Sequence, residues 1–286
     1  CDLLSEDALQ RLRNKLALRD AELDRWRAIT HRMFVPFHNG QIISQFEGYE
    51  ELEEFDWQGY RRKYENIQRL DRILEAEGDT PNRYKLSKQA DVLMLLYLFS
   101  ADELTELFEG LGYEFSPEAI PRNIDYYLDR TSHGSTLSWV VHAWVLARRA
   151  RDRSWALFDQ ALRSDVADIQ GGTTPEGIHL GAMAGVVDQI QRGYTGIVTR
   201  NNILWFEPCL PDELSELRLR LRYRGYALEV TVTREILRIR ALRTRGHPIR
   251  IGYRDEVVEF TDREVREFRM RTSPSPEPPG LRELQG

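Results

Sequence analysis

The hydrophobic period of the chain changes after Trp205, and this change constrains the fold more than any other feature. Before it, apolar residues recur at helical spacing, whereas residues 217–223 alternate strictly between apolar or aromatic side chains and arginines. Four further segments are strand-like, at residues 226–233, 236–242, 249–253 and 257–260. We therefore expect a mainly α chain in which a helical region is followed by a small antiparallel β-sheet domain.

The helical region begins with two predicted helices within residues 4–33, opened by the start signal Ser5-Glu6-Asp7. Each has an expected buried stripe, formed by Leu9, Leu12 and Leu16 on the first helix and by Leu23, Trp26 and Ile29 on the second. Residues 86–99 predict a helix that is apolar nearly all round and buried on most sides, with Lys88 and Gln89 in its first turn. Ser100 and Glu103 predict a capping box for the next helix.

Three later helices are predicted at residues 138–149, 152–164 and 178–191. The middle one is amphipathic and the other two are apolar nearly all round, an alternation that suits an inner and an outer ring of helices. In the last helix, the small residues 181–185 form a face that permits close backbone approach.

Two small-residue loops precede apolar helical runs: the first loop, residues 131–136 (TSHGST), and the second loop, residues 171–174 (GGTT). A Gly/Ser/Thr loop at a helix start presents free backbone N–H groups and hydroxyls, with the positive end of the helix dipole behind them. Such a place suits an anion or a sugar hydroxyl. Because each loop is accompanied by a histidine, His133 or His179, we expect both loops to build one pocket.

Composition excludes several classes of protein. The net charge of −6 argues against a general nucleic-acid surface, and the longest apolar run, residues 92–99, is too short to span a bilayer. The two cysteines, Cys1 and Cys209, rule out a disulfide framework and fit a reducing, cytoplasmic compartment. A start at Cys1 without an initiator Met allows a lipid-modified cysteine but favours a piece of a longer chain.

Three motifs together resemble glycoside hydrolase family 65, which includes trehalose, maltose and kojibiose phosphorylases and acid trehalases. They are Lys88-Gln89-Ala90-Asp91, residues 132–138 (SHGSTLS) and residues 172–185 (GTTPEGIHLGAMAG), and the resemblance covers roughly residues 23–260. It implies an N-terminal β-sandwich, an (α/α)6 barrel and a C-terminal β-sheet domain. By this resemblance, residues 1–207 are the C-terminal portion of the catalytic barrel and 208–271 the C-terminal β-sheet domain. Residues 272–286 are expected to be a disordered tail because of their Pro-rich composition.

The resemblance also implies roles for individual residues. Lys88 and Gln89 match the pair that hydrogen-bonds the glucosyl unit. Ser135 and Thr136 match hydroxyls that bind inorganic phosphate, and His179 matches the phosphate-binding histidine. Residues His133, Gly134 and Glu176 are possible supporting residues.

No catalytic residue is identified, because the family's general-acid glutamate lies in a motif expected upstream of Cys1 and has no match here. We therefore expect the chain to form a homo-oligomer or to pair with the missing N-terminal half. Its other partners are a disaccharide and inorganic phosphate, the latter as co-substrate, and we expect no cofactor, no metal, no nucleic acid and no membrane.

The implied activity is inverting phosphorolysis of an α-linked glucose disaccharide to β-glucose 1-phosphate. An acid protonates the leaving oxygen while phosphate attacks the opposite face, so no protein base is needed. Protonated His179 would add a charge-assisted bond, so phosphate affinity should fall as the pH rises.

A trehalase-like hydrolase is the first alternative to this activity. It needs a carboxylate base, for which Asp168 and Glu176 are the only acidic residues expected near the loops. A non-catalytic carbohydrate-binding half-protein is the second.

Overall fold

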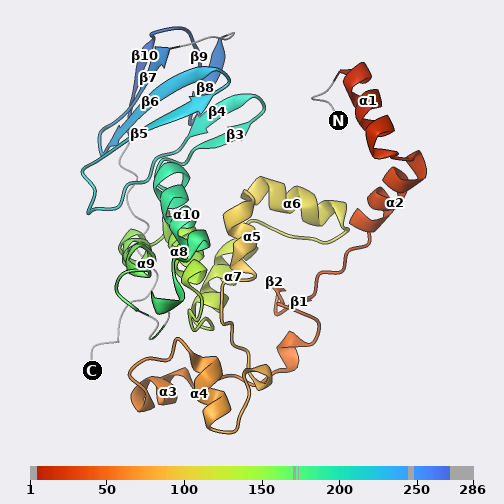
Figure 1. Cartoon of the computed structure of the whole chain (residues 1–286), viewed down its shortest axis with the longest axis vertical. Coiled ribbons are helices and arrows are strands. Elements are labelled where there is room, and N and C mark those ends of the chain that lie inside the picture. The colour runs from red at the N-terminus through yellow and green to blue at the C-terminus, as the bar shows by residue number, and fades with distance from the viewer. Residues whose placement is uncertain (1–4, 170–171, 173, 244–247, 271–286) are drawn as a thin grey trace.

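The computed structural model describes residues 5–169, 172, 174–243 and 248–270, and it consists of a helical region followed by two β-sheets (Figure 1). The predicted order of a helical region and then a sheet domain is therefore confirmed. The predicted tail at residues 272–286 lies outside the described residues. Within the described ranges, none of the helices combines the length and the apolarity needed to cross a membrane.

The first two helices, α1 (Glu6–Leu16) and α2 (Asp20–Thr30), extend away from the remainder of the chain (Figure 1). Their existence was correctly predicted, and the Ser5 side chain accepts from the Ala8 N–H as an N-cap. Their predicted buried stripes are wrong, since neither helix has a buried residue. Leu16 is 62% exposed and Trp26 is 49% exposed. None of the hydrophobic core clusters of the described residues includes a side chain of these two helices, and Leu12 and Ile29 are exposed as well.

The predicted helix over residues 86–99 is largely wrong, because only α5 (Leu93–Leu98) is helical. The backbone of residues 87 and 88 is instead used to bind the first loop, so Lys88 and Gln89 do not lie in a first helical turn. Leu93 is the only buried residue of α5, and Leu98 is 59% exposed. The helix therefore exposes apolar surface that the sequence pattern assigned to the core.

Shorter elements fill the first half of the chain. They are β1 (Phe37–His38), β2 (Ile42–Ile43), η1 (Tyr49–Glu51), α3 (Trp57–Lys63), α4 (Leu70–Ala76), η2 (Pro81–Arg83), α6 (Ala101–Gly110) and α7 (Ala119–Leu128). The capping box of α6 is confirmed, because Ser100 and Glu103 each accept from the other's backbone N–H. Tyr127 of α7 donates its hydroxyl to the Ile43 carbonyl, which fixes β2 against α7.

The centre of the helical region is formed by α8 (Thr136–Leu146), α9 (Arg151–Arg163) and α10 (Leu180–Asp188), with the turn η3 (Thr174–Glu176) before α10 and the π-helical turn η4 (Gln189–Gly193) after it. Helix α8 is buried along most of its length, as predicted. It begins two residues earlier than expected, which places Ser135 at its N-cap position. Helix α10 is less covered than predicted, since Leu180 is 76% exposed and Val187 is 60% exposed.

Ten strands are assigned in the described residues, and the last eight build two four-stranded sheets. One sheet has the order β10-β7-β6-β5, from β10 (Val265–Arg269), β7 (Ile236–Arg243), β6 (Tyr226–Thr233) and β5 (Glu216–Tyr223), all antiparallel. The other has the order β3-β4-β8-β9, from β3 (Val198–Arg200), β4 (Ile203–Phe206), β8 (Ile249–Tyr253) and β9 (Glu256–Phe260). The five predicted strands are confirmed, whereas β3, β4 and β10 were not predicted and β4 pairs with β8 in parallel.

The sheets share a core with the ends of two helices. Ala147, directly after α8, and Tyr194, directly after η4, belong to the same hydrophobic cluster as Phe206, Leu228 and Ile239. The carboxyl ends of α8 and of the α10–η4 segment therefore both face the sheets. The two helices consequently run in the same direction, and their N-termini both point away from the β domain.

Close packing of α8 on α10 depends on one glycine. A Cβ atom built on Gly185 would lie 2.5 Å from Val140 Cγ1, whereas one built on Gly181 would have nothing within 4 Å. The predicted close backbone approach is thus found at Gly185 and not at Gly181.

We predict that Gly185→Ala lowers the free energy of unfolding by about 1–3 kcal/mol, because the new methyl group overpacks against Val140. Gly181→Ala is the matched control on the same helix and should be neutral or stabilising by about 0.5–1 kcal/mol, since alanine favours the helix. Urea denaturation of both variants measures the difference. Equal effects of the two substitutions would contradict the packing described.

Candidate functional site

The first loop is docked on the segment that contains Lys88. Ser132 donates its N–H to the Ser87 carbonyl (2.9 Å), and Gly134 donates its N–H to the Lys88 carbonyl (2.8 Å). A Cβ atom on Gly134 would lie 2.8 Å from both the Gln68 carbonyl oxygen and Lys88 Cγ, so only glycine fits here. The structure therefore brings two of the three sequence motifs together.

Lys88 and Gln89 are each held by a carboxylate, of which Asp71 was not indicated by the sequence and Asp91 belongs to the same motif. Lys88 Nζ lies 2.9 Å from Asp71 Oδ2, with half of the lysine side chain exposed. Gln89 Nε2 donates to Asp91 Oδ1 at 2.9 Å, and both residues line a cavity of about 160 Å³ together with Ser138. The amine and the amide are thus positioned beside the first loop.

Asp71 is a poor proton acceptor in this setting. Burial acts to raise its pKa, but the hydrogen bond and charge of Lys88, with smaller contributions from the Arg72 N–H and Arg69, hold the pKa below its usual value. A carboxylate with a lowered pKa stays ionised and pairs with the lysine rather than activating water.

Ser135 and Thr136 lie at the start of α8. Ser135 is the N-cap residue, yet its side chain makes no capping hydrogen bond, and Thr136 is buried. The usual structural reason for a serine at this position is therefore missing. The first-turn N–H groups of α8 and the Ser135 hydroxyl remain suited to an anion.

His133 shapes the first loop from behind. Its backbone adopts the left-handed region (φ 57°), and its ring stacks on Trp139 with centroids 4.2 Å apart. The Ser138 hydroxyl lies 2.9 Å from His133 Nδ1 and 3.4 Å from His142 Nδ1. This packing holds a residue with a strained backbone in place.

Both imidazoles of this cluster are neutral. Burial lowers the pKa of His133 to about 3, with further lowering by the charges of His142, Arg153 and Arg61. Burial likewise lowers the pKa of His142 to about 4, against a hydrogen bond to the Ser138 backbone that acts to raise it.

The second loop is organised by two aspartates. Asp168 accepts hydrogen bonds from the N–H groups of Gly172 (2.8 Å) and Thr174 (3.3 Å), while Gly171 and Thr173 lie outside the described residues. His179, the N-cap residue of α10, makes no side-chain cap; its Nδ1 lies 2.6 Å from Asp165 Oδ1.

We expected Asp168 and Glu176 to be the only acidic residues near the two loops, and this expectation is wrong. Asp165 contacts His179, and Asp71 contacts Lys88, on which the first loop is docked.

One segment contacts both loop regions. Asn66 Nδ2 donates to the Ile169 carbonyl at 3.4 Å, just before the second loop, and Gln68 is the residue that crowds Gly134 in the first loop. The N-termini of α8 and α10 also point to the same end of the helix pair. A pocket shared by Ser135, Lys88 and His179 remains a prediction, and these contacts agree with it.

Sequence reasoning missed Asp71, Asp165 and residues 66–68. The acidic pair Asp165 and Asp168 before the second loop was a usable signal, since carboxylates often accept from the N–H groups of such loops. Nothing in the sequence marks Asp71 or residues 66–68.

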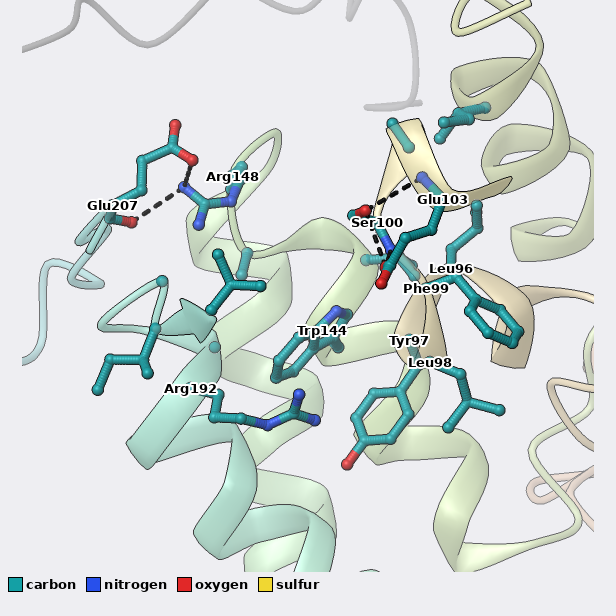
Figure 2. Close-up of a pocket in the computed structure, with 18 of the residues that line it drawn as sticks. Leu96, Tyr97, Leu98, Phe99, Ser100, Glu103, Trp144, Arg148, Arg192 and Glu207 are labelled. Carbon is teal, nitrogen blue, oxygen red and sulfur yellow. Dashed lines mark hydrogen bonds and ion pairs between the residues drawn. The ribbon is translucent and has the colours of Figure 1, made fainter. Parts of the chain in front are cut away.

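A separate cavity of about 460 Å³ lies at the opposite end of α8 (Figure 2). Its charged groups already have partners, since Arg148 pairs with Glu207 and Arg192 pairs with Asp188. Figure 2 shows Arg192 beside Trp144 and Tyr97, and its guanidinium lies 5.0 Å from the Trp144 ring centroid. The cavity contains none of the predicted site residues.

The chain matches two family models. Residues 2–188 match the glycosyl hydrolase family 65 central catalytic domain, and residues 197–260 match the family's C-terminal domain. The resemblance inferred from the three motifs is therefore confirmed.

Individual proteins agree with this match. An uncharacterised glycosyl hydrolase of Mycobacterium tuberculosis is 53% identical over 90% of this chain. A trehalose 6-phosphate phosphorylase of Lactococcus lactis is 35% identical over 73% of it. The chain spans only 19% and 27% of the length of these two relatives. A solved structure named "Putative kojibiose phosphorylase from human microbiome" aligns with a TM-score of 0.71 and 20% identity, over 92% of this chain and 36% of that one, which supports the fold.

The buried imidazoles predict an acid-sensitive fold. Because the pKa values of His133 and His142 are lower in the folded chain than the ordinary 6.5, the unfolded chain binds more protons below that pH. Their stabilisation is present above about pH 6.5 and is lost as the pH falls toward 4, by up to about 1.4 kcal/mol per pH unit for each ring.

Urea denaturation between pH 7 and about 5.5, where few carboxylates titrate, measures the first part of this loss. His142→Gln should show a shallower dependence on pH than the unchanged chain. An unchanged slope in His142→Gln would contradict a neutral buried ring.

Proposed function

This chain belongs to glycosyl hydrolase family 65, and on that premise we propose that it supplies the phosphate- and glucosyl-binding part of an inverting disaccharide phosphorylase. The observation that carries the proposal is the docking of the first loop on Lys88, which unites a glucosyl-binding motif with a phosphate-binding motif. The (α/α)6 barrel, of which the helical region would be the back part, and the domain division at residues 207 and 208 belong to the same proposal.

The residues have chemically sensible roles in such a reaction. Phosphate is already a nucleophile, so the protein needs to hold a dianion in line with the bond that is cleaved. Ser135, Thr136 and the N–H groups of α8 would bind it from one side, and His179 from the other. Lys88 and Gln89 would hold the glucosyl unit, with Asp71 and Asp91 fixing their side chains.

The proposed substrate is an α-linked glucose disaccharide of the trehalose, maltose or kojibiose type. Curated relatives carry the names trehalose 6-phosphate, kojibiose and maltose phosphorylase, and each is matched over less than a third of its length. The names therefore support the reaction class without choosing the sugar. A cytoplasmic location, as expected from the two cysteines, belongs to the same proposal.

The missing general acid would come from an upstream half of the barrel or from a second copy. Apolar side chains stand open to solvent on α1, α2, α5 and α10, among them Leu16, Trp26, Leu98 and Leu180. Such exposure favours a partner surface, because soluble proteins rarely leave large apolar patches uncovered. It also weakens the alternative of an independent carbohydrate-binding module.

A hydrolase of the same family is the second candidate. It requires a carboxylate base on the far side of the sugar. The carboxylates that the structure adds to the site, Asp71 and Asp165, are each bonded to a basic side chain. This pairing favours phosphate over activated water as the nucleophile.

The reaction class can be tested with the chain supplied with the upstream half of a family relative. Trehalose, maltose and kojibiose are offered with and without inorganic phosphate, and glucose 1-phosphate and free glucose are measured. We expect glucose 1-phosphate only with phosphate present. Phosphate-independent release of glucose would support the hydrolase, and no turnover with any sugar would support the binding module.

Replacing both hydroxyls, Ser135→Ala with Thr136→Ala, should raise the KM for phosphate at least about tenfold more than the KM for disaccharide. The loss of charge-assisted hydrogen bonds, worth about 1.5–3 kcal/mol each, is the reason. Steady-state kinetics with each substrate varied in turn gives the two KM values.

Ser100→Ala is the control, because Ser100 does cap its helix. It should lower the free energy of unfolding by about 1 kcal/mol and leave both KM values unchanged. Equal losses for phosphate and disaccharide in the double variant would mean that the phosphate site is misplaced.

A further inference from the structure

Asp165 contacts the predicted phosphate-binding histidine in two ways. Its Oδ1 lies 2.6 Å from His179 Nδ1, and its two carboxylate oxygens lie 3.1 and 3.2 Å from the His179 backbone N–H. The carboxylate is only 10% exposed, whereas the imidazole is 27% exposed. The buried partner therefore holds the ring, and the ring reaches toward solvent.

The position of Asp165 is itself fixed. It follows Ser164, a fully buried residue at the end of α9 whose hydroxyl donates to the Ala161 carbonyl. His179 is the N-cap residue of α10. The contact thus joins the end of one helix to the start of the next, and the ring orientation is set by two helices rather than by a loose loop.

The geometry determines which ring nitrogen carries the hydrogen. A carboxylate only accepts hydrogen bonds, so Nδ1 must be protonated to contact Asp165 at this distance. Nε2 is then the ring nitrogen left to contact a ligand. It is not among the buried side-chain atoms of the described residues that lack a hydrogen-bond partner. When both ring nitrogens carry a hydrogen, Nε2–H can donate to an anion.

We propose that Asp165 is a positioning residue for phosphate, which fixes His179 in the Nδ1–H tautomer and directs Nε2 toward the bound anion. The inference rests on the proposed function, because it takes inorganic phosphate to be the ligand of His179. No sequence motif pointed to Asp165, and its role is distinct from that of Asp168, which binds backbone N–H groups of the second loop.

A purely structural role would be capping of α10 through the His179 backbone N–H. Asp165→Asn separates the two roles, since the asparagine oxygen still accepts from the backbone while the negative charge is lost. Asp159→Asn is the matched control, because Asp159 pairs with Arg163 on the exposed side of α9.

The first measurement is the ¹⁵N NMR spectrum of the imidazole nitrogens in this 286-residue chain, at a pH where the ring is neutral. We expect His179 in the Nδ1–H tautomer, and a shift toward the Nε2–H tautomer in Asp165→Asn but not in Asp159→Asn. An Nε2–H tautomer in the unchanged chain would overturn the inference and leave the proposed function intact.

The second measurement is titration with inorganic phosphate, followed by the Nε2 resonance of His179. Asp165→Asn should weaken phosphate binding at least about tenfold at unchanged urea stability, and Asp159→Asn should not weaken it. Equal affinity in both variants would overturn the inference. Absence of any phosphate effect in the unchanged chain, with the tautomer as expected, would instead overturn the proposed function and the phosphate role of Asp165 with it.

Discussion

The hydrogen bond from the Gly134 N–H to the Lys88 carbonyl is the contact on which the candidate site depends. It is possible only because Gly134 has no side chain, since a Cβ atom would strike both Gln68 and Lys88. It takes the backbone before α5 out of the helix that the hydrophobic pattern predicts. As a result, the motif that contains Lys88 and the motif at residues 132–138 become neighbours, although they lie more than forty residues apart in the sequence.

Around this contact, the site is built from polar side chains that are held by others. Lys88 is held by Asp71, His179 by Asp165 and the backbone of the second loop by Asp168. Behind the first loop, the neutral ring of His133 packs against Trp139 and against the neutral ring of His142, so neither imidazole adds charge. Lys88 thus lies beside the first loop, while the buried imidazoles behind that loop stay uncharged.

Hydrophobic periodicity predicted most helices and five of the strands, because both depend on local pattern. Periodicity failed in segments whose conformation or burial is decided by tertiary contacts. The apolar stripes of α1 and α2 stay outside the core clusters of the described residues. Residues 87 and 88 are not helical because the first loop uses their backbone. The motifs identified the family and Lys88, Ser135 and His179 as candidates. They could not reveal Asp71, since a carboxylate that orients a neighbour has no signature of its own in one sequence, whereas Asp165 belongs to the acidic pair before the second loop.

The central claim is that the two loops bind one phosphate beside Lys88, and a crystal structure of this chain with inorganic phosphate tests it most directly. The account predicts one anion within hydrogen-bond distance, about 3.2 Å, of both Ser135 Oγ and His179 Nε2. An anion bound to one loop alone, or Ser135 and His179 on opposite sides of the molecule with no cavity between them and Lys88, would contradict it.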